Sequence, residues 1–257
     1  MPELPDVEGF RRTFIRHAAG KTVQALMVDT NAARNTTAQG LGRALKHRTF
    51  ADPTRRGKWL ICPTEGPSMV LHFGMTGTLL WMEGRAERHP HDRLILVLTD
   101  GQLVFRDMRK LGGVWLARRE RDLNALLERV GPDALAATST EFLARLRGRR
   151  SSVKSALLNQ KVVAGLGNLT VDESLWRAGI APRRAVSSLS DEDLALLQRE
   201  THKVLHSSAQ AGRVPDRGGW LTAVRGRGAS CPRCGASLLR DTVAGRTTYW
   251  CPRCQAE

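Results

Sequence analysis

The first residues of the chain bring together two groups that can act in covalent catalysis. Pro2 follows the initiator methionine, and Glu3 follows Pro2. If Met1 is removed, the ring nitrogen of Pro2 becomes a free secondary amine, which is a nucleophile when it is unprotonated. Because an α-amino group has a pKa of about 7.7–8.0, a useful fraction is unprotonated near neutral pH. The alternative is that the proline only marks the start of the chain.

A second chemically active group lies near the C-terminal end of the chain. Two CxxC pairs, sixteen residues apart, have the spacing of a tetrahedral zinc site. Its predicted ligands are Cys231, Cys234, Cys251 and Cys254. Because protein sulfur fills all four positions, we predict a structural zinc ion that supplies the folding free energy of a very small unit. A redox pair would need a βαβ context that is missing here, and Cys62, in an apolar segment, is predicted to be a buried, inert thiol.

Two other places in the sequence could bind a phosphate. Gly165, Gly167 and Asn168 form a Gly-Leu-Gly-Asn turn before a helical run, and backbone N–H groups at a helix start attract anions. Asn168 can cap that helix and donate its side-chain amide to a phosphate, or the turn can be a simple connection. Arg246 follows a predicted turn at 244–245, where it either binds a phosphate or is an ordinary solvated arginine.

The composition favours a polyanionic partner. The 257 residues contain 40 Lys and Arg against 25 Asp and Glu, which gives a net charge of +15 and a pI near 10.8. Such a field is typical of nucleic-acid binding and, less often, of binding to an acidic membrane surface. No apolar run approaches the ~20 residues of a membrane span, and no leader peptide opens the chain. With its cysteine pattern, the chain is therefore expected in a reducing, cytoplasmic compartment.

The elements that must position these groups indicate an α+β multidomain protein. We predict a β-sandwich with a flanking helix over residues 1–118, because many short strands follow one another without intervening helices. Residues 119–228 are predicted to be mainly helical, with a mobile basic linker at 211–230, and residues 229–257 to form a zinc-finger hairpin. The predicted strands cover 22–28, 58–62, 68–73, 78–81, 93–99 and 102–107, the last two joined by a hairpin turn at Asp100-Gly101.

Five motifs in this order resemble the bacterial formamidopyrimidine-DNA glycosylase and endonuclease VIII family. They are PELPDVE at the N-terminus, RGK around Lys58, HFGMTG at 72–77, KVVAGLGNLTVDESLWRAGI at 161–180 and the hairpin from Arg246 to Cys254. The resemblance covers nearly the whole chain. It implies an N-terminal β-sandwich, a helix–two-turn–helix domain and a zinc finger, which agrees with the three regions predicted above.

The resemblance implies a base-excision repair enzyme that removes damaged bases from duplex DNA and then cuts the abasic strand. Pro2 would attack C1′ of the damaged nucleotide and form a Schiff base, and Glu3 would act as general acid and base. β- and δ-elimination would then release the strand ends. Lys58, Asn168 and Arg246 would hold the phosphates that flank the lesion.

The resemblance also implies residues that contact the rest of the duplex. Met75 would fill the gap left by the flipped base, and Arg109 would contact the orphaned base opposite. His91, Lys154 and Gly167 are further predicted DNA contacts. Four of the implied roles have a simpler alternative. Met75 could be a core residue, Arg109 a cation at a strand end, Lys58 a surface cation and Glu3 an acid at a helix start.

Several positions depart from the family pattern, mainly where the lesion would be recognised. Asp6 replaces a glutamate, Leu111 replaces the phenylalanine of the wedge, and Thr170 replaces a tyrosine. The segment 211–230 is shorter than its counterpart in guanine-lesion enzymes. The prediction is therefore a monomeric, nucleoid-associated DNA glycosylase and lyase whose preferred base is left open. A non-catalytic lesion-binding protein is the alternative. A zinc-dependent nuclease or a zinc-ribbon regulator is a weaker hypothesis, because the histidines show no ligand spacing.

Overall fold

The computed structural model describes residues 1–84, 87–226 and 228–255. Cα packing divides the chain into two units. The first contains residues 1–2 and 6–129, and the second contains residues 3–5 and 130–257. The sequence-based boundaries at 118/119 and 228/229 remain a prediction. Among the described residues, no helix combines the length and apolar character needed to cross a bilayer.

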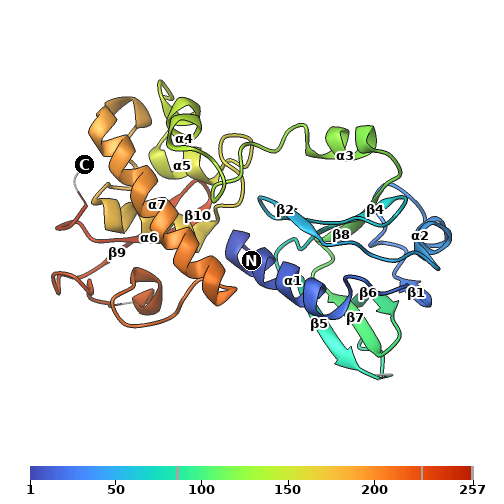
Figure 1. The fold of residues 1–257 in the computed structure, drawn as a ribbon. Coiled ribbons are helices and arrows are strands. Elements are labelled where there is room, and N and C mark those ends of the chain that lie inside the picture. Colours follow the sequence, from blue (N-terminus) through green and yellow to red (C-terminus); the bar gives the residue numbers. More distant parts are fainter. Residues whose placement is uncertain (85–86, 227, 256–257) are drawn as a thin grey trace. The chain divides into compact units, whose positions relative to one another are not determined.

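The first unit is a β-sandwich, as predicted (Figure 1). One antiparallel sheet has the order β1-β6-β7-β5 and the other has the order β2-β3-β4-β8. The first sheet comprises β1 (Ala25–Val28), β5 (Thr78–Glu83), β6 (Asp92–Val97) and β7 (Gly101–Arg106). The second comprises β2 (Thr54–Arg56), β3 (Trp59–Cys62), β4 (Ser68–His72) and β8 (Gly113–Ala117). Its helices are α1 (Leu4–His17), α2 (Ala38–Leu45) and α3 (Glu120–Leu127).

Alternation along the strands builds the core of the sandwich. Leu60 and Cys62 on β3 and Leu94 and Leu96 on β6 are two residues apart, so each pair points to one face of its sheet. The side chains of both sheets join one buried cluster, to which α1 contributes Phe14. Cys62 is fully buried, as the sequence predicted.

The hairpin between β6 and β7 turns one residue earlier than predicted. Leu98 donates its N–H to the Gly101 carbonyl at 2.9 Å, so the turn residues are Thr99 and Asp100. Gly101 belongs to β7 instead, and a Cβ there would lie 2.5 Å from the Met82 carbonyl oxygen. The glycine is therefore required by the close approach of β5 rather than by the turn.

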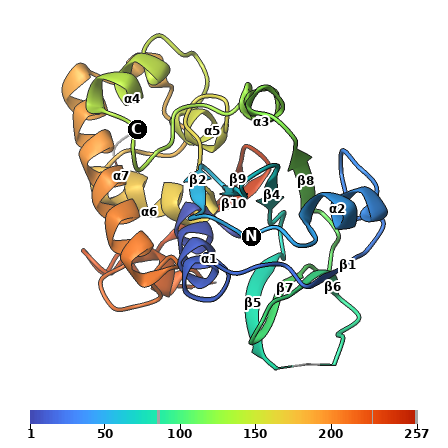
Figure 2. The same ribbon diagram turned by 45° about the vertical axis from the view of Figure 1, so that its right-hand side comes forward.

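The second unit contains the two-turn element and the helices that follow residue 130, whereas the first helix of the predicted helical region, α3, belongs to the first unit (Figure 2). Its helices are α4 (Ser139–Leu146), α5 (Val153–Leu158), α6 (Asn168–Ala178) and α7 (Asp191–Ala211), with a 3-10 turn η1 at Val186–Ser188. Ser190 caps the start of α7, since its hydroxyl accepts from the Asp193 N–H at 3.1 Å. Gly212 ends that helix in the left-handed conformation, with a φ of 70°. The N-terminal residue Leu4 is buried in the helical core of this unit.

The C-terminal hairpin has the predicted turn. Strands β9 (Leu239–Val243) and β10 (Arg246–Trp250) pair antiparallel. The turn residues Ala244 and Gly245 both have a positive φ, of 51° and 68°, and two such residues in succession are typical of a two-residue hairpin loop.

The segment 211–230, predicted to be a mobile basic linker, contains folded structure. It contains a 3-10 turn, η2 (Leu221–Val224), and both Trp220 and Leu221 are buried. Leu221 packs against Trp176 of α6 and the cysteines of the finger. Arg and Gly dominate the composition, but these two apolar residues are enough to anchor the segment; Arg227 lies outside the described residues.

Candidate active site

Glu3 occupies the N-terminus of helix α6. Its carboxylate accepts hydrogen bonds from the Leu169 N–H at 2.8 Å, the Thr170 N–H at 3.0 Å and the Thr170 hydroxyl at 2.6 Å. These N–H groups have no partner within the helix, and the positive end of the helix dipole attracts an anion. The side chain is only 2% exposed. The carboxylate next to Pro2 is thus held at a fixed position.

The glycines of the two-turn element make room for this arrangement. Leu4 donates its N–H to the Gly165 carbonyl at 3.0 Å. A Cβ on Gly167 would lie 2.2 Å from the Glu3 carboxyl carbon, and a Cβ on Gly165 would lie 2.5 Å from Leu4 Cδ1. Gly165 also has a φ of 108°. Both glycines therefore serve to seat the N-terminal segment.

This arrangement corrects three predictions about the Gly-Leu-Gly-Asn turn. The anion at the start of α6 is the Glu3 carboxylate, not a phosphate. Asn168 is the first helical residue and does not cap the helix; the cap position is Gly167, and Glu3 supplies the accepting oxygens. Gly167 is buried and donates its N–H to Thr170 Oγ1 at 2.9 Å, which argues against the predicted DNA contact.

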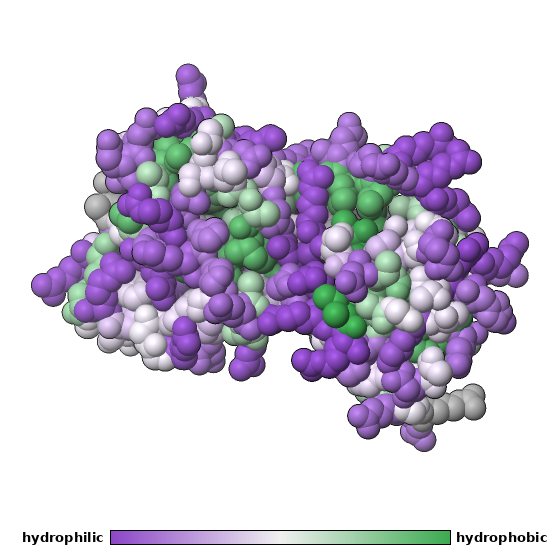
Figure 3. Space-filling model, viewed as in Figure 1, coloured by the Kyte–Doolittle hydropathy of each residue, from purple (hydrophilic) through white to green (hydrophobic). Residues whose placement is uncertain are grey.

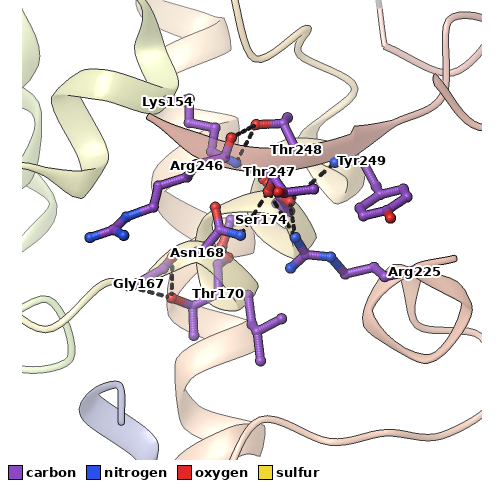
Figure 4. A network of polar contacts seen from close by, with 12 residues as sticks. Lys154, Gly167, Asn168, Thr170, Ser174, Arg225, Arg246, Thr247, Thr248 and Tyr249 are labelled. Atoms are coloured by element: carbon purple, nitrogen blue, oxygen red, sulfur yellow. Dashed lines mark hydrogen bonds and ion pairs between the residues drawn. The ribbon is translucent and has the colours of Figure 1, made fainter. Parts of the chain in front are cut away.

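Asn168 instead joins α6 to the finger hairpin. Its side-chain amide donates to the Thr247 carbonyl at 2.8 Å, as Figure 4 shows. The amide nitrogen carries a second hydrogen that this bond does not use. Arg246, the residue before Thr247, is exposed, and its guanidinium extends away from the buried contacts. The structure thus brings the two predicted phosphate ligands, Asn168 of α6 and Arg246 of β10, close together.

Lys154 does not face solvent as a DNA contact would. Its side chain is fully buried, and its ammonium contacts Asp172 at 2.5 Å and Thr248 Oγ1 at 2.7 Å. Burial lowers the pKa of Lys154 and raises the pKa of Asp172, and the attraction between the two charges opposes both shifts. The placement argues against the predicted DNA contact, because the ammonium is used inside the protein.

Lys58 lies in the tight turn between β2 and β3 in the first unit. The nearby imidazole of His72 is largely buried, and burial, with a smaller contribution from the charge of Lys58, lowers its pKa to about 4. His72 is therefore neutral at physiological pH. Its Nδ1 accepts the Gly74 N–H at 3.2 Å.

A buried carboxylate connects the two loops that carry Met75 and Arg109. Asp107 accepts hydrogen bonds from the Thr76 hydroxyl at 2.5 Å and from the Gly112 N–H at 2.7 Å. Thr76 Oγ1 in turn accepts the Arg109 N–H at 3.1 Å. Asp107 is completely buried, so its hydrogen bonds connect both loops on their inner side. Sequence reasoning did not assign this role to Asp107.

The surface of these loops differs residue by residue. Arg109 is exposed and Met75 is half-buried. Leu111, at the altered wedge position, is 49% exposed. His91 is half-buried and is tied to the same loop, because its carbonyl accepts the Asp107 N–H at 2.9 Å.

The four predicted zinc ligands converge. All four sulfur atoms lie within 4.8 Å of one another. Cys231 and Cys254 are 3.8 Å apart and Cys234 and Cys251 are 3.5 Å apart. Four sulfurs at about 2.3 Å from one zinc ion stand about 3.8 Å apart in a tetrahedron, so the cluster fits one structural zinc. Trp176 of α6 donates its indole N–H to Cys231 Sγ at 3.4 Å, which is a typical outer contact of a metal ligand.

Hydrophilic side chains cover most of the face drawn in Figure 3, with apolar residues in small patches between them. The exposed side chains include many of the 40 Lys and Arg that give the net charge of +15. This surface suits a polyanionic partner.

The β-sandwich, the two-turn element and the four-cysteine finger, with an N-terminal carboxylate seated on α6, define the class of protein. Three family models match in the same order: the N-terminal domain of formamidopyrimidine-DNA glycosylase at residues 1–114, its H2TH domain at 130–215 and a zinc finger found in that enzyme and in IleRS at 230–256. The chain belongs to the formamidopyrimidine-DNA glycosylase family.

Individual relatives are similar over their full length. A formamidopyrimidine-DNA glycosylase of Geobacter metallireducens is 38% identical, with 99% of this chain and 100% of that protein covered. One from Thermus thermophilus is also 38% identical, over 100% of this chain and 99% of that protein. The Lactococcus lactis enzyme bound non-covalently to DNA with an AP site has a TM-score of 0.91 at 31% identity, covering 99% of this chain and 100% of that one. A G226P mutant of the same enzyme, bound to DNA with Fapy-dG, has the same TM-score and identity.

Proposed function

We propose that this protein is a DNA glycosylase that removes damaged bases from duplex DNA and also cleaves the resulting abasic site as a lyase. The observation that carries the proposal is the position of Glu3, a buried carboxylate fixed at the start of α6 and joined by one peptide bond to Pro2. Family membership and the DNA-bound structures of relatives support the substrate class.

The nucleophile is the Pro2 nitrogen. In the translated chain this nitrogen is part of the peptide bond to Met1, so removal of Met1 is a condition of the mechanism. The free amine attacks C1′ of the damaged nucleotide, and the C1′–N bond to the base breaks, with the base taking the bonding electrons and then a proton from water. Ring opening of the sugar then gives an iminium ion, a cationic Schiff base between the Pro2 nitrogen and C1′.

Glu3 is suited to the proton transfers that this chemistry needs. It lies within one residue of the nucleophile, about 3.8 Å from Cα to Cα, and it is held by three donors that orient the carboxylate. The Glu3 carboxylate takes the proton that the Pro2 amine loses on attack and delivers it to the ring oxygen as the sugar opens. The iminium ion then accepts electrons when the C2′ proton leaves, so that the C3′–O bond breaks, and a second elimination breaks the C5′–O bond. Water releases the sugar fragment and restores the amine.

Cations and a side-chain amide bind the phosphates that flank the lesion. Lys58 in the turn before β3 and Arg246 at the start of β10 supply positive charge. Asn168 supplies the remaining amide hydrogen beside Arg246. Arg-phosphate and amide-phosphate hydrogen bonds orient DNA without reading its sequence.

Met75 and Arg109 enter the duplex where the base leaves. Extruding a base costs a few kcal/mol, and side chains that fill the vacated space offset part of this cost. Asp107 joins the loops that carry both residues, so the backbone under these two side chains is held in place. Arg109 has the donors to contact the unpaired base opposite.

Strand cleavage on a duplex with a single abasic site tests the proposal. The expected products are a one-nucleotide gap with phosphate at both new ends, which requires both eliminations. Cleavage should persist in EDTA at concentrations that leave the finger loaded, because zinc is structural. Tight binding without cleavage would instead favour a non-catalytic lesion-binding protein, the alternative that the altered wedge residue Leu111 suggests.

A further inference from the structure

Arg225 follows η2, in the segment predicted to be a mobile basic linker. Its side chain is 10% exposed, and one guanidinium nitrogen contacts the Asp172 carboxylate at 3.0 Å. The same nitrogen donates to the Thr247 carbonyl at 3.0 Å. The guanidinium lies over the ring of Tyr249, 5.3 Å from its centroid. An arginine with these partners is held in one orientation.

Two side chains therefore meet at one backbone oxygen of β10. The Thr247 carbonyl accepts from Arg225 and from the amide of Asn168, as Figure 4 shows. Asn168 comes from α6, whereas Arg225 comes from the segment before the finger. The carbonyl thus joins three parts of the second unit at the residue that follows Arg246.

Thr248, the next residue of β10, is held by Lys154. The Thr248 hydroxyl accepts from Lys154 at 2.7 Å and donates to the Arg246 carbonyl at 3.0 Å. Asp172 holds both cations, since it contacts Lys154 on one oxygen and Arg225 on the other. The backbone at the start of β10 is consequently fixed on both sides, while the Arg246 side chain stays exposed.

We propose that Arg225 is a positioning residue for phosphate binding: it holds the Thr247 carbonyl, and with it the start of β10, in place, so that Arg246 presents its donors to a DNA phosphate. This inference rests on the proposed function. Arg225 is not itself the phosphate ligand, because its guanidinium is largely buried and committed to Asp172 and Thr247.

A double-mutant cycle tests the inference. The measured quantity is the affinity of the full-length, zinc-loaded protein for a duplex with a chemically reduced abasic site, which cannot be cleaved. We expect Arg246→Ala and Arg225→Ala each to weaken binding about tenfold, the value of one charge-assisted hydrogen bond. If Arg225 acts through Arg246, then Arg225→Ala in the Arg246→Ala background should weaken binding less than twofold.

Two further variants separate positioning from charge and from folding. Arg213→Ala removes an exposed arginine from the same segment and should leave affinity within twofold of the wild type. Arg225→Lys keeps the charge against Asp172 but offers no planar fork, so it should bind zinc fully and weaken DNA binding to an intermediate degree. If Arg225→Ala loses zinc, the cycle is carried out with Arg225→Lys instead.

Each outcome decides one claim. Additive losses in the double variant, or wild-type affinity of Arg225→Ala, would overturn the positioning role and leave the proposed function intact. Wild-type affinity of Arg246→Ala would show that this arginine binds no phosphate, and the proposed function would lose that ligand whatever Arg225 does.

Discussion

At the scale of single residues, Glu3 gains its importance from where its carboxylate is held. It accepts three hydrogen bonds from the first turn of α6. Thr170 supplies two of these donors, its backbone N–H and its side-chain hydroxyl. The Thr170 hydroxyl, next to the helix terminus, thus adds a third hydrogen bond that holds the Glu3 carboxylate.

Replacing Glu3 with glutamine should remove most of the activity. The amide keeps the shape of the side chain but cannot transfer a proton, so we expect strand cleavage to slow by about 10²–10⁴-fold. The control is Glu192→Gln, which changes a glutamate in the first turn of α7 and should leave the rate unchanged. Single-turnover cleavage of abasic DNA measures both variants. Equal rates for Glu3→Gln and the wild type would exclude the proposed role.

His72 should make the stability of the protein depend on pH in a defined window. Its folded-state pKa of about 4 lies below the unfolded value of about 6.5, so the unfolded state binds more protons between these values. Stability is complete above pH 6.5 and falls by roughly 3 kcal/mol as the pH drops towards 4.

Denaturant unfolding at several pH values measures this effect. His72→Asn, whose oxygen can replace Nδ1 as acceptor for the Gly74 N–H, should flatten the curve in that window. His47→Asn changes an exposed histidine that has a positive φ, which asparagine tolerates, and serves as the control. Identical pH profiles for wild type and His72→Asn would contradict the prediction.

At the scale of elements, the turn before α6 acts as a seat for the N-terminus. We predict that Gly167→Ala lowers strand cleavage at least tenfold, because a Cβ 2.2 Å from the Glu3 carboxyl carbon must displace that side chain. The φ of Gly167 is −130°, so crowding rather than backbone strain causes the loss.

Gly42→Ala is the matched control for this substitution. Gly42 lies in α2, and a Cβ there meets nothing within 4 Å, so the variant should be fully active and more stable by up to about 1 kcal/mol. Cleavage rates and melting temperatures of the two variants decide the matter. A fully active Gly167→Ala would show that the position of Glu3 is not critical.

The finger is the second element with a clear test. We expect one zinc per chain by elemental analysis, lost in Cys234→Ser because one of four sulfurs is replaced. DNA affinity should fall with it, since Arg246 is carried by the hairpin that the metal organises. Cys62→Ala, which changes a buried thiol in the sandwich, should keep its zinc. Retention of zinc by Cys234→Ser would contradict the assigned ligand set.

Local patterns in the sequence were sufficient for most elements. The CxxC spacing predicted the finger, and the succession of short strands without intervening helices predicted the sandwich. The errors arose where a contact between residues far apart in the sequence gives a residue a different structural role. Gly101 serves a close strand approach, and the α6 terminus is occupied by Glu3, which is more than 160 residues away along the chain.

The site was predicted less completely than the fold, for the same physical reason. The roles of Asp107, Asp172 and Arg225 depend on their burial and on the hydrogen bonds and ion pairs that they make in the folded chain. The sequence around each residue gives no sign of these contacts. The resemblance alone implied a DNA contact for Lys154, and lysine is normally exposed. Its neutralisation by Asp172, eighteen residues later, is visible only in the folded chain.

At the scale of the whole molecule, the net charge of +15 and the family membership both point to DNA, while the proposed chemistry depends on one nitrogen atom, that of Pro2. Trapping with borohydride tests it directly, because this reagent reduces an imine to a stable amine. We predict a covalent adduct with abasic DNA, and mass spectrometry should locate it on a peptide that begins at Pro2. An active protein that retains Met1, or an adduct on a lysine, would contradict the account.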